Sequence, residues 1–364
     1  MTLSEFDSFR PTEPARRRRP EGGKRGMGRR RDNGDGSREM PMVPEPEFTS
    51  YYGRPVVKPA PWGDDVAIYL FLGGVAAGSA LLGLGGQLTG RPTLRRNARL
   101  GALAAVSAGA VALVKDLGRP ERFLHMLRTF KVTSPMSVGS WILSAFSAGT
   151  GIAAVAEIDR MTGSRLPIGP LRKVLQAVEG PAGFEAALFA GPLAAYTAVL
   201  LGDTATPTWN AAHEELPFVF VSSACLASAG LAMVTTPVRE TGPARKLAVL
   251  GVLGDVAAMK VMEHRMDPVA AEPLHQGKAG AMLKWSERLA VAGGVGALVG
   301  GRNRVVATVS GVALLAASAL TRFGVFEAGL ASARDPRYTI EPQKNRLAAR
   351  RAAGVTDDAI TTGS

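Results

Sequence analysis

Residues 98–123 read ARLGALAAVSAGAVALVKDLGRPERF, and this stretch decides the kind of fold that the chain can adopt. Residues 98–114 form an apolar run that is long enough to cross a bilayer as a helix. Residues 115–123 follow at once and include five charged side chains: Lys115, Asp116, Arg119, Glu121 and Arg122. The charged segment is therefore either a polar cap where a helix leaves the membrane or part of a functional site.

Similar apolar windows of about 20 residues recur along the chain, which is the pattern of a polytopic membrane protein. We count about eight, near residues 66–88, 98–115, 136–157, 183–202, 216–235, 245–264, 281–300 and 303–322. Charged residues interrupt the sixth and seventh windows. The sequence thus predicts an all-α membrane protein with about eight transmembrane helices. The GxxxG pair Gly74 and Gly78 in the first window predicts close helix packing.

The composition of the 364-residue chain divides it into three segments. Residues 1–45 form a basic tail with runs of arginine, which we expect to be disordered. Residues 46–330 form the membrane domain, and residues 331–364 form a polar C-terminal tail. No apolar segment adjoins the arginines, so we expect no signal peptide. The basic tail suits anionic lipid headgroups or a partner subunit better than nucleic acid.

The chain has few residues that could hold a redox metal. Cys225 is its only cysteine, and an iron–sulfur cluster needs several thiolates. The four histidines lie at or beyond predicted helix ends, whereas a membrane b-type haem needs axial ligands inside the helices: His125, His213, His264 and His275. We therefore expect no haem, no iron–sulfur cluster and no metal site in this chain.

The loops alternate in charge, and this alternation predicts an orientation. The first, third, fifth and seventh connections hold most of the loop Lys and Arg residues, among them Arg95, Arg172 and Arg245. The positive-inside rule places these connections in the cytoplasm. We therefore expect a multi-pass protein of the cell (cytoplasmic) membrane with both termini on the extracytoplasmic side. The arginine-rich tail argues the other way, but the rule weights residues near the spans.

The extracytoplasmic loops carry the candidate catalytic residues. Asp116 lies at a membrane boundary with Arg119 three residues later. The two form either a local salt bridge or a site in which Asp116 accepts a proton from a hydroquinone and Arg119 stabilises the carboxylate. His213 is either a solvated loop histidine or a general acid/base. Trp141 is either an interfacial anchor or a wall for a flat aromatic ligand.

Ionisable side chains inside the windows form a second set of candidates, because charges are costly within a bilayer. Glu185 and Tyr196 are eleven positions apart, close to three helical turns, and therefore share a helix face. The candidates in the sixth and seventh windows are Asp255, Lys260, Glu263, His264, Lys284 and Arg288. These side chains form either structural ion pairs or a path for protons or a quinone headgroup.

Six segments, taken together in their order and spacing, resemble the NrfD-like family of polysulfide reductase membrane subunits. They are EFTSYYGRPVVKPAPW at residues 47–62, YLFLGGVAAGSALL at 69–82, DLGRPERF at 116–123, SPMSVGSW at 134–141, GPLAAYTAVLL at 191–201 and PTWNAAHEELPF at 207–218. The resemblance covers most of residues 47–325.

This resemblance implies eight helices arranged as two four-helix bundles, and menaquinone or ubiquinone bound as substrate. It also implies two partners, an iron–sulfur (ferredoxin-like) subunit and a molybdopterin catalytic subunit, with membrane lipids around the chain and no nucleic acid. The family's quinone pocket lies near the start of the first helix, where this chain offers Asp64, Asp65 and Tyr69. Some members place an Asn and a His there. This chain has neither an Asn nor a His at the start of its first helix, so Asp116 and His213 are expected to supply those contacts.

The leading hypothesis is therefore a quinone-reacting membrane subunit of a respiratory oxidoreductase complex. It passes electrons between the quinone pool and the iron–sulfur partner, and it does not act on the terminal substrate by itself. Trp141, Glu185 and Tyr196 complete its predicted quinone contacts. Two alternatives stay open: a secondary transporter, whose expected internal repeat we do not find, and a passive membrane anchor without a redox site.

Overall fold

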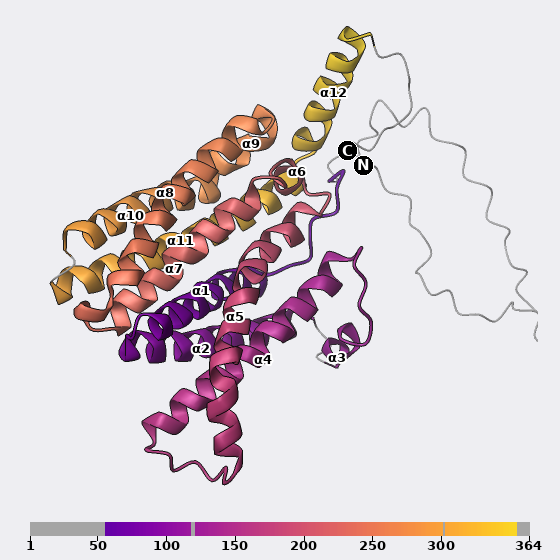
Figure 1. The fold of residues 1–364 in the computed structure, drawn as a ribbon. Helices are drawn as coiled ribbons and strands as arrows, with labels where there is room; N and C mark the ends of the chain where they lie inside the picture. The colour runs from indigo at the N-terminus through magenta and orange to yellow at the C-terminus, as the bar shows by residue number, and fades with distance from the viewer. Residues whose placement is uncertain (1–54, 118–120, 301–302, 355–364) are drawn as a thin grey trace, which may run out of the picture. The chain divides into compact units, whose positions relative to one another are not determined.

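The structure is a computed structural model, and it describes residues 55–117, 121–300 and 303–354. Every regular element in these ranges is a helix (Figure 1). Eight helices are long: α1 (Asp64–Leu88), α2 (Pro92–Asp116), α4 (Pro135–Met161), α5 (Leu171–Gly202), α7 (Leu216–Thr235), α8 (Gly242–Arg265), α10 (Gly277–Val299) and α11 (Arg304–Arg334). The others are α3 (Arg122–Met126), α6 (Pro207–Ala211), the 3-10 turn η2 (Val238–Glu240), α9 (Pro268–His275) and α12 (Arg337–Ala352).

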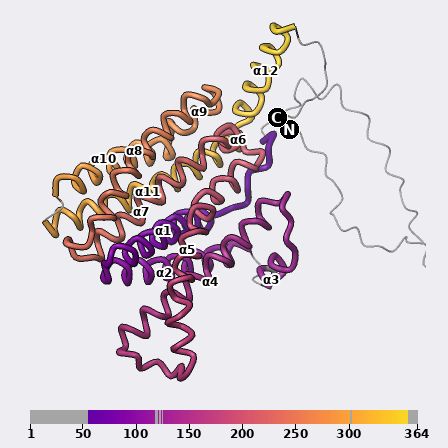
Figure 2. Tube along the Cα trace, in the orientation of Figure 1, coloured from indigo at the N-terminus to yellow at the C-terminus, as the bar shows by residue number. Residues whose placement is uncertain are grey.

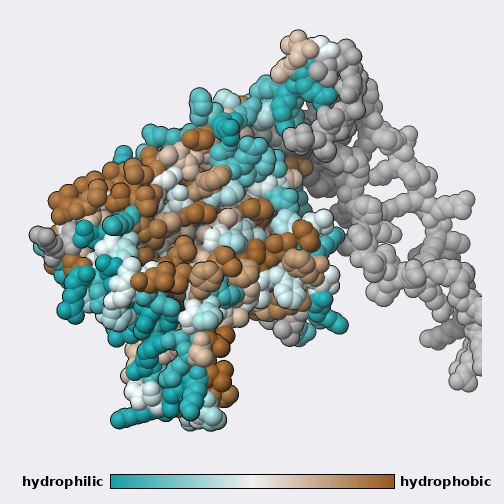
Figure 3. Space-filling model, viewed as in Figure 1, coloured by the Kyte–Doolittle hydropathy of each residue, from teal (hydrophilic) through white to brown (hydrophobic). Residues whose placement is uncertain are grey.

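The predicted all-α class is confirmed for the residues that the structure describes, and the predicted disordered tail, residues 1–45, lies outside them. Six of the long helices are long and apolar enough to cross a membrane: α1, α2, α4, α5, α7 and α11. The other two, α8 and α10, correspond to the windows that charged residues interrupt. In the view of Figure 3, hydrophobic surface runs over the long helices, and hydrophilic surface gathers at the tip of the α4–α5 hairpin.

Proline and side-chain caps explain where many helices begin. Proline stands in the first turn of α2, α4, α6, α7, α8 and α9, where its missing N–H costs no hydrogen bond. Asn303 caps α11, because its Oδ1 accepts a hydrogen bond of 2.8 Å from the Val305 N–H. Hydropathy detects only the apolar part of a helix, so α5 begins earlier and α11 ends later than the predicted windows.

Successive long helices run in opposite directions, so their ends form two faces (Figures 1 and 2). We call the face at which α1 begins the proximal face and the face at which α1 ends the distal face. The connections that contain α3, α6 and α9 all lie at the proximal face. The predicted extracytoplasmic segments are thereby gathered on one side of the protein.

Helix α1 lies at the centre of the packing and contacts α2, α5 and α7. Its contact with α7 depends on the GxxxG pair. A Cβ atom on Gly78 would collide with Ser228, and one on Gly74 would lie 3.3 Å from the Cβ of Ala224. Small residues therefore let the two helices approach closely, which confirms the packing predicted for Gly74 and Gly78.

Two long-range caps tie the distal connections together. The Glu240 carboxylate accepts hydrogen bonds from the backbone N–H groups of Thr93 (2.8 Å) and Leu94 (3.0 Å), at the start of α2. Arg304 donates to the carbonyl oxygens of Met233 (3.0 Å) and Thr236 (2.7 Å), at the end of α7. Burial opposes ionisation of Glu240, but the hydrogen bonds from the α2 terminus outweigh it and lower the pKa of this carboxyl.

Candidate functional site

An apolar pocket lies at the proximal face, between the start of α1, the ends of α2 and α5, the short helix α3 and the start of α4. We call it the proximal pocket, and its cavity measures about 110 Å³. The residues that line it are Trp62, Val66, Tyr69, Leu113, Asp116, Leu117, Phe123, Met126, Met136, Gly139, Ser140, Leu143, Tyr196 and Leu200. Most of these side chains are aliphatic or aromatic, which suits a flat, largely apolar ligand.

Four polar side chains interrupt this apolar lining: Tyr69, Asp116, Ser140 and Tyr196. Asp116 is half-buried and is the last residue of α2, so its carboxylate lies at the mouth of the pocket. Tyr69 is five residues into α1 and Tyr196 is six residues before the end of α5, which places both about 8–9 Å deeper along their helices. The pocket therefore combines a carboxylate at its mouth with two phenols further in.

A glycine on α4 makes room for the inner phenol. A Cβ atom on Gly139 would collide with the ring of Tyr196, so any larger residue there would push the phenol away. The neighbouring Ser140 donates its hydroxyl to the carbonyl of Met136 at 2.9 Å. Its oxygen lone pairs remain able to accept a hydrogen bond from a ligand.

Trp62 forms one wall of the pocket and is held in place from the C-terminal half of the chain. Its ring stacks on that of Trp209, with 5.9 Å between centroids and 24° between planes. Trp209 is fully buried and donates its indole N–H to the Val325 carbonyl at 2.8 Å. The ring of Trp209 also lies 5.6 Å from that of Phe326. Helix α11 thus fixes a wall of the proximal pocket through the side chain of Trp209.

An ion pair distinguishes Asp65 from Asp116, the two acidic residues at the mouth of the proximal pocket. Lys115 Nζ lies 3.2 Å from the Oδ1 of Asp65, and the Lys115 side chain is 72% exposed. Such an exposed pair contributes little to stability, but it engages Asp65 outside the pocket. Asp116, next to Lys115 in sequence, lines the pocket instead. The structure therefore separates the two carboxylates by position.

The structure brings together only part of the predicted site. Tyr69, Asp116 and Tyr196 line the proximal pocket, whereas Asp64 is exposed and is not among the lining residues. Trp141 is 42% exposed and meets Phe130 edge-on at 6.2 Å, outside the pocket. Trp141 therefore does not line the pocket, and its role as an interfacial anchor stays a prediction.

Three further predicted residues lie elsewhere. His213 is exposed, and its Nδ1 lies 2.7 Å from the Asn210 carbonyl oxygen. Glu185 is half-buried in α5, eleven residues before Tyr196, or about 16 Å along the helix. Its Oε2 is buried without a hydrogen-bond partner among the described residues. Arg119 lies outside the described residues, so its pairing with Asp116 stays a prediction.

Sequence reasoning missed most of the apolar wall. Phe123, Met126 and Met136 line the pocket but carry no pattern that separates them from ordinary interfacial residues. Phe123 stands in the quoted segment DLGRPERF, and Met136, Gly139 and Ser140 stand in SPMSVGSW, but the sequence singles out only Trp141 there. Gly139 and Ser140 face the pocket, whereas Trp141 points away from it. The rotation of α4 about its own axis decides this, and the sequence alone does not give that rotation.

Five charged residues of α2, α4 and α5 form a second polar region near the distal face. We call it the ion cluster: Arg95, Arg99, Glu157, Arg160 and Glu179. The buried Glu157 carboxylate accepts from Arg95 Nε at 2.6 Å and from Arg99 Nη1 at 2.9 Å. Arg160 pairs with Glu157 at 3.2 Å and also with Glu179. Each acid in this cluster therefore has at least one basic partner.

Metal ligands are not gathered within the ranges that the structure describes, where no group of three or more His, Cys, Asp or Glu could hold a metal ion. Cys225 is a free, partly buried cysteine in α7. The polar groups of the proximal pocket are a carboxylate, two phenols and a hydroxyl. This set is suited to hydrogen bonding and proton exchange with the oxygen atoms of a ligand.

The chain is similar to a known family of membrane proteins. No curated protein matches the chain. The sequence model of the family described as "Polysulphide reductase, NrfD" matches residues 56–264, more than half of the chain. The matched region begins before α1 and ends at the last turn of α8, so it contains the whole proximal pocket. The chain therefore belongs to the polysulphide reductase NrfD family of membrane subunits.

Proposed function

We propose that this chain is the quinone-reacting membrane subunit of a respiratory oxidoreductase complex, and that the proximal pocket binds the quinone headgroup. One observation carries the proposal: a single apolar pocket near the helix ends holds the Asp116 carboxylate and the phenols of Tyr69 and Tyr196. A quinone headgroup is a flat ring with an oxygen atom at each end. The apolar walls and the polar groups at two depths fit both parts of such a ligand.

The polar side chains of the proximal pocket have different roles at its mouth and deeper inside it. Bound quinol supplies two electrons and two protons in each turnover. The Asp116 carboxylate accepts the two protons one after the other and releases each to water at the proximal face, as a general base does, while the two electrons pass to the iron–sulfur subunit. Tyr69 and Tyr196 donate hydrogen bonds further in and orient the ring. Trp62, fixed through Trp209, covers the ring and excludes water.

The partner subunits dock at the proximal face in this proposal. The pocket opens there, and an electron-transfer partner must lie close to the bound headgroup. This chain contains one cysteine, so the clusters that receive the electrons belong to the iron–sulfur subunit. That subunit serves the molybdopterin subunit, which acts on the terminal substrate. Menaquinone or ubiquinone is the mobile electron carrier.

We further propose that α8 and α10 cross the membrane with the six apolar helices. The contacts support two four-helix bundles: α1, α2, α4 and α5 in one, and α7, α8, α10 and α11 in the other. Basic residues such as Arg95, Arg172 and Arg304 lie towards the distal face, which supports a cytoplasmic distal face and an extracytoplasmic proximal face.

Substitution of Asp116 by Asn tests the proposed function. Asn keeps the shape of the side chain but cannot accept the proton, so quinol oxidation by the assembled complex should fall about 100-fold. That loss corresponds to about 2.7 kcal/mol in the activation free energy. The yield of the complex and copurification of the iron–sulfur partner should stay unchanged.

Asp65→Asn is the matched control, because Asp65 lies at the same mouth but pairs with Lys115 outside the pocket. We expect its turnover to stay within about threefold of wild type, since an exposed pair is weak. Normal turnover in Asp116→Asn would remove Asp116 from the mechanism. An assembled wild-type complex without quinone-linked electron transfer would instead identify a passive anchor.

A further inference from the structure

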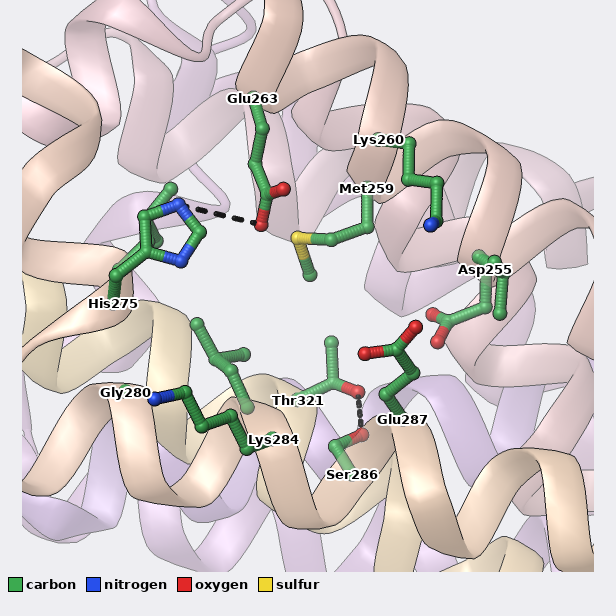
Figure 4. A pocket seen from close by; sticks show the side chains of 13 residues that line it. Asp255, Met259, Lys260, Glu263, His275, Gly280, Lys284, Ser286, Glu287 and Thr321 are labelled. Carbon is green, nitrogen blue, oxygen red and sulfur yellow. Dashed lines mark hydrogen bonds and ion pairs between the residues drawn. The ribbon is translucent and has the colours of Figure 1, made fainter. Parts of the chain in front are cut away.

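A second cavity lies between α8, α9, α10 and α11, away from the proximal pocket (Figure 4). We call it the polar cavity, and it measures about 220 Å³. One water needs only about 10–15 Å³ of such volume, so several waters fit. The charged side chains that line it are Asp255, Lys260, Glu263, His275, Lys284 and Glu287.

The polar cavity leads from the proximal face to the middle of the helices. His275 and Glu263 stand at its outer end, with 3.8 Å between the His275 Nε2 and the Glu263 Oε1 (Figure 4). Asp255 is ten residues before the end of α8, and Glu287 is ten residues after the start of α10. Both lie about 15 Å along their helices from the proximal ends, which is half the thickness of a bilayer core of about 30 Å.

The inner end of the cavity holds two carboxyl groups that point towards one another. In Figure 4 the carboxyl groups of Asp255 and Glu287 point towards one another at one end of the cavity, with Asp255 buried and Glu287 exposed. Asp255 is 4% exposed, and its Oδ1 has no hydrogen-bond partner among the described residues. A permanently ionised carboxylate in that position would be costly, because its charge is buried and its oxygen is unsatisfied. A carboxyl group that binds a proton avoids this cost.

The nearest buried cation is held by other groups. Arg322 of α11 is fully buried and donates to Thr197 Oγ1 at 3.1 Å and to the Phe220 carbonyl at 2.5 Å. Its guanidinium carbon also lies 3.9 Å from the centre of the Phe220 ring. Arg322 acts on Asp255 through space, but no ion pair within 4.0 Å joins them in the described part of the chain. Asp255 is therefore not locked as the counter-ion of Arg322.

Hydroxyl groups continue the polar lining beyond the two acids. The Ser286 and Thr321 hydroxyl oxygens lie 2.6 Å apart at the cavity wall, and Ser286 also donates to the Ala317 carbonyl at 2.7 Å. Hydroxyl groups both donate and accept hydrogen bonds, so they can relay a proton or order the waters that do. The cavity thus provides an aqueous route and polar contacts down to mid-depth.

We propose that Asp255 and Glu287 form a proton-binding site that is filled from the proximal face through the polar cavity. In the loading step, a hydronium ion in the cavity gives its proton to a carboxylate oxygen: an O–H bond of the hydronium breaks and a carboxyl O–H bond forms. Release reverses the step, and no electron is transferred. The site uses neither the residues nor the volume of the proximal pocket, so it stands independently of the proposed quinone chemistry.

The charges around Asp255 come from every neighbouring helix. They are Lys260 and Glu263 of α8, His275 of α9, Lys284 and Glu287 of α10, and Arg322 of α11. Lys260, Lys284 and Arg322 favour the carboxylate, and Glu263 and Glu287 favour the carboxyl group. Glu287, the acid that faces Asp255, is the neighbour whose removal should have the clearest effect.

Labelling of the complex in native membranes with dicyclohexylcarbodiimide tests the proposal, because this apolar reagent modifies protonated carboxyl groups in membrane proteins. Peptide mass spectrometry should find the N-acylurea on Asp255, with a yield that falls as the pH is raised and the carboxyl group loses its proton. In Glu287→Gln the fall should shift to lower pH, since a neighbouring negative charge no longer favours the protonated form. The matched internal control is Asp159, equally buried but paired with Arg172 at 3.0 Å, which should stay unlabelled.

An infrared measurement guards against poor access of the reagent. A carbonyl band of a protonated carboxylic acid, present in wild type and absent in Asp255→Asn, should follow the same pH dependence. Absence of both the label and the band would overturn the proposal, as would a pH dependence that Glu287→Gln leaves unchanged. The label and the band should persist in Asp116→Asn, so failure of the proposed quinone site and failure of this proton site are distinguishable.

Discussion

The ion cluster in the N-terminal half and the polar cavity in the C-terminal half treat buried charge in opposite ways. In the cluster, the buried Glu157 carboxylate receives hydrogen bonds from Arg95 and Arg99. In the cavity, the buried Asp255 has an unsatisfied oxygen and faces a second acid. Both regions lie among long helices, so their difference is one of pairing rather than of depth alone.

This difference shows how to distinguish buried groups that keep one protonation state from buried groups that can bind and release a proton. Burial of an ion is costly, and good ion pairs with further hydrogen bonds offset the cost. A group whose partners are complete has no reason to change its protonation state. A group whose partners are incomplete lowers its energy by gaining a proton. We therefore expect the cluster to hold its helices together and the cavity to supply a site for proton exchange.

The largest expected effect comes from breaking the ion cluster with Glu157→Ala. Arg99, whose side chain is 5% exposed, would then lose the carboxylate to which it donates. Removal of one partner of a buried ion pair costs up to about 3–5 kcal/mol, and the Glu179 carboxylate, 3.7 Å from Arg99 Nη1, offsets part of this cost. We expect a much lower yield of folded chain and a lower midpoint of thermal unfolding in detergent, measured by intrinsic tryptophan fluorescence.

Glu341→Ala provides the control, because the Glu341 ion pair with Arg337 is exposed on both sides and should contribute less than about 1 kcal/mol. The protein that does fold with Glu157→Ala should retain quinol oxidation per mole, since the cluster does not line the proximal pocket. If Glu157→Ala unfolded no more easily than Glu341→Ala, the cluster would not be a structural element.

A smaller effect is expected from Glu240→Gln at the distal cap. Gln keeps some hydrogen bonding to the start of α2 but loses the negative charge, so we expect a cost of about 1 kcal/mol, reduced by solvent at this half-exposed site. The lowered pKa of Glu240 also sets a pH dependence. Its contribution is fully present above the unfolded value of about 4.3 and is lost as the pH falls through the lower folded value.

Thermal unfolding at a series of pH values measures this dependence. The difference in stability between wild type and Glu240→Gln should be constant at neutral pH and should shrink below about pH 4. A constant difference down to pH 3 would show that the carboxylate charge plays no part in the cap. Glu214→Gln, an exposed acid on the proximal side, should give no comparable change.

The sequence predicts the apolar helices of this protein better than the contacts between side chains of different helices. Apolar windows find the six apolar spans because hydropathy measures the property that lipid selects. The charged end of α2 and the positions of Tyr69 and Tyr196 near helix ends follow from helical periodicity and from the family resemblance. These signals are sufficient to assemble three of the predicted site residues in the proximal pocket.

The remaining site residues depend on contacts between distant segments. The shared loop face of His213 and Asp116 predicts a common site, but a shared face does not bring two side chains into one pocket. Asp65 is engaged by Lys115, fifty residues away, and Trp62 is held through Trp209. Periodicity describes one helix at a time, so it cannot show which partners a neighbouring helix supplies. The pairing state of Asp255 is hidden from the sequence for the same reason.

The substitution Asp255→Asn should have the smallest effect on stability. It is also the sharpest test of the comparison between the ion cluster and the polar cavity. Asn preserves the shape of the side chain and removes only the ability to ionise. Because Asp255 has no ion-pair partner within 4.0 Å among the described residues, the midpoint of thermal unfolding should correspond to a change below about 0.5 kcal/mol, or to a small gain.

Asp159→Asn is the matched comparison, since Asp159 is equally buried but accepts from Arg172 Nε at 3.0 Å. Loss of that charge-assisted hydrogen bond should cost about 1.5–3 kcal/mol, so the two variants should differ clearly in thermal unfolding. An equal loss in Asp255→Asn would mean that Asp255 is permanently ionised and stabilises Arg322 through space. The polar cavity would then be a second structural charge cluster, and the contrast between the two halves of the chain would disappear.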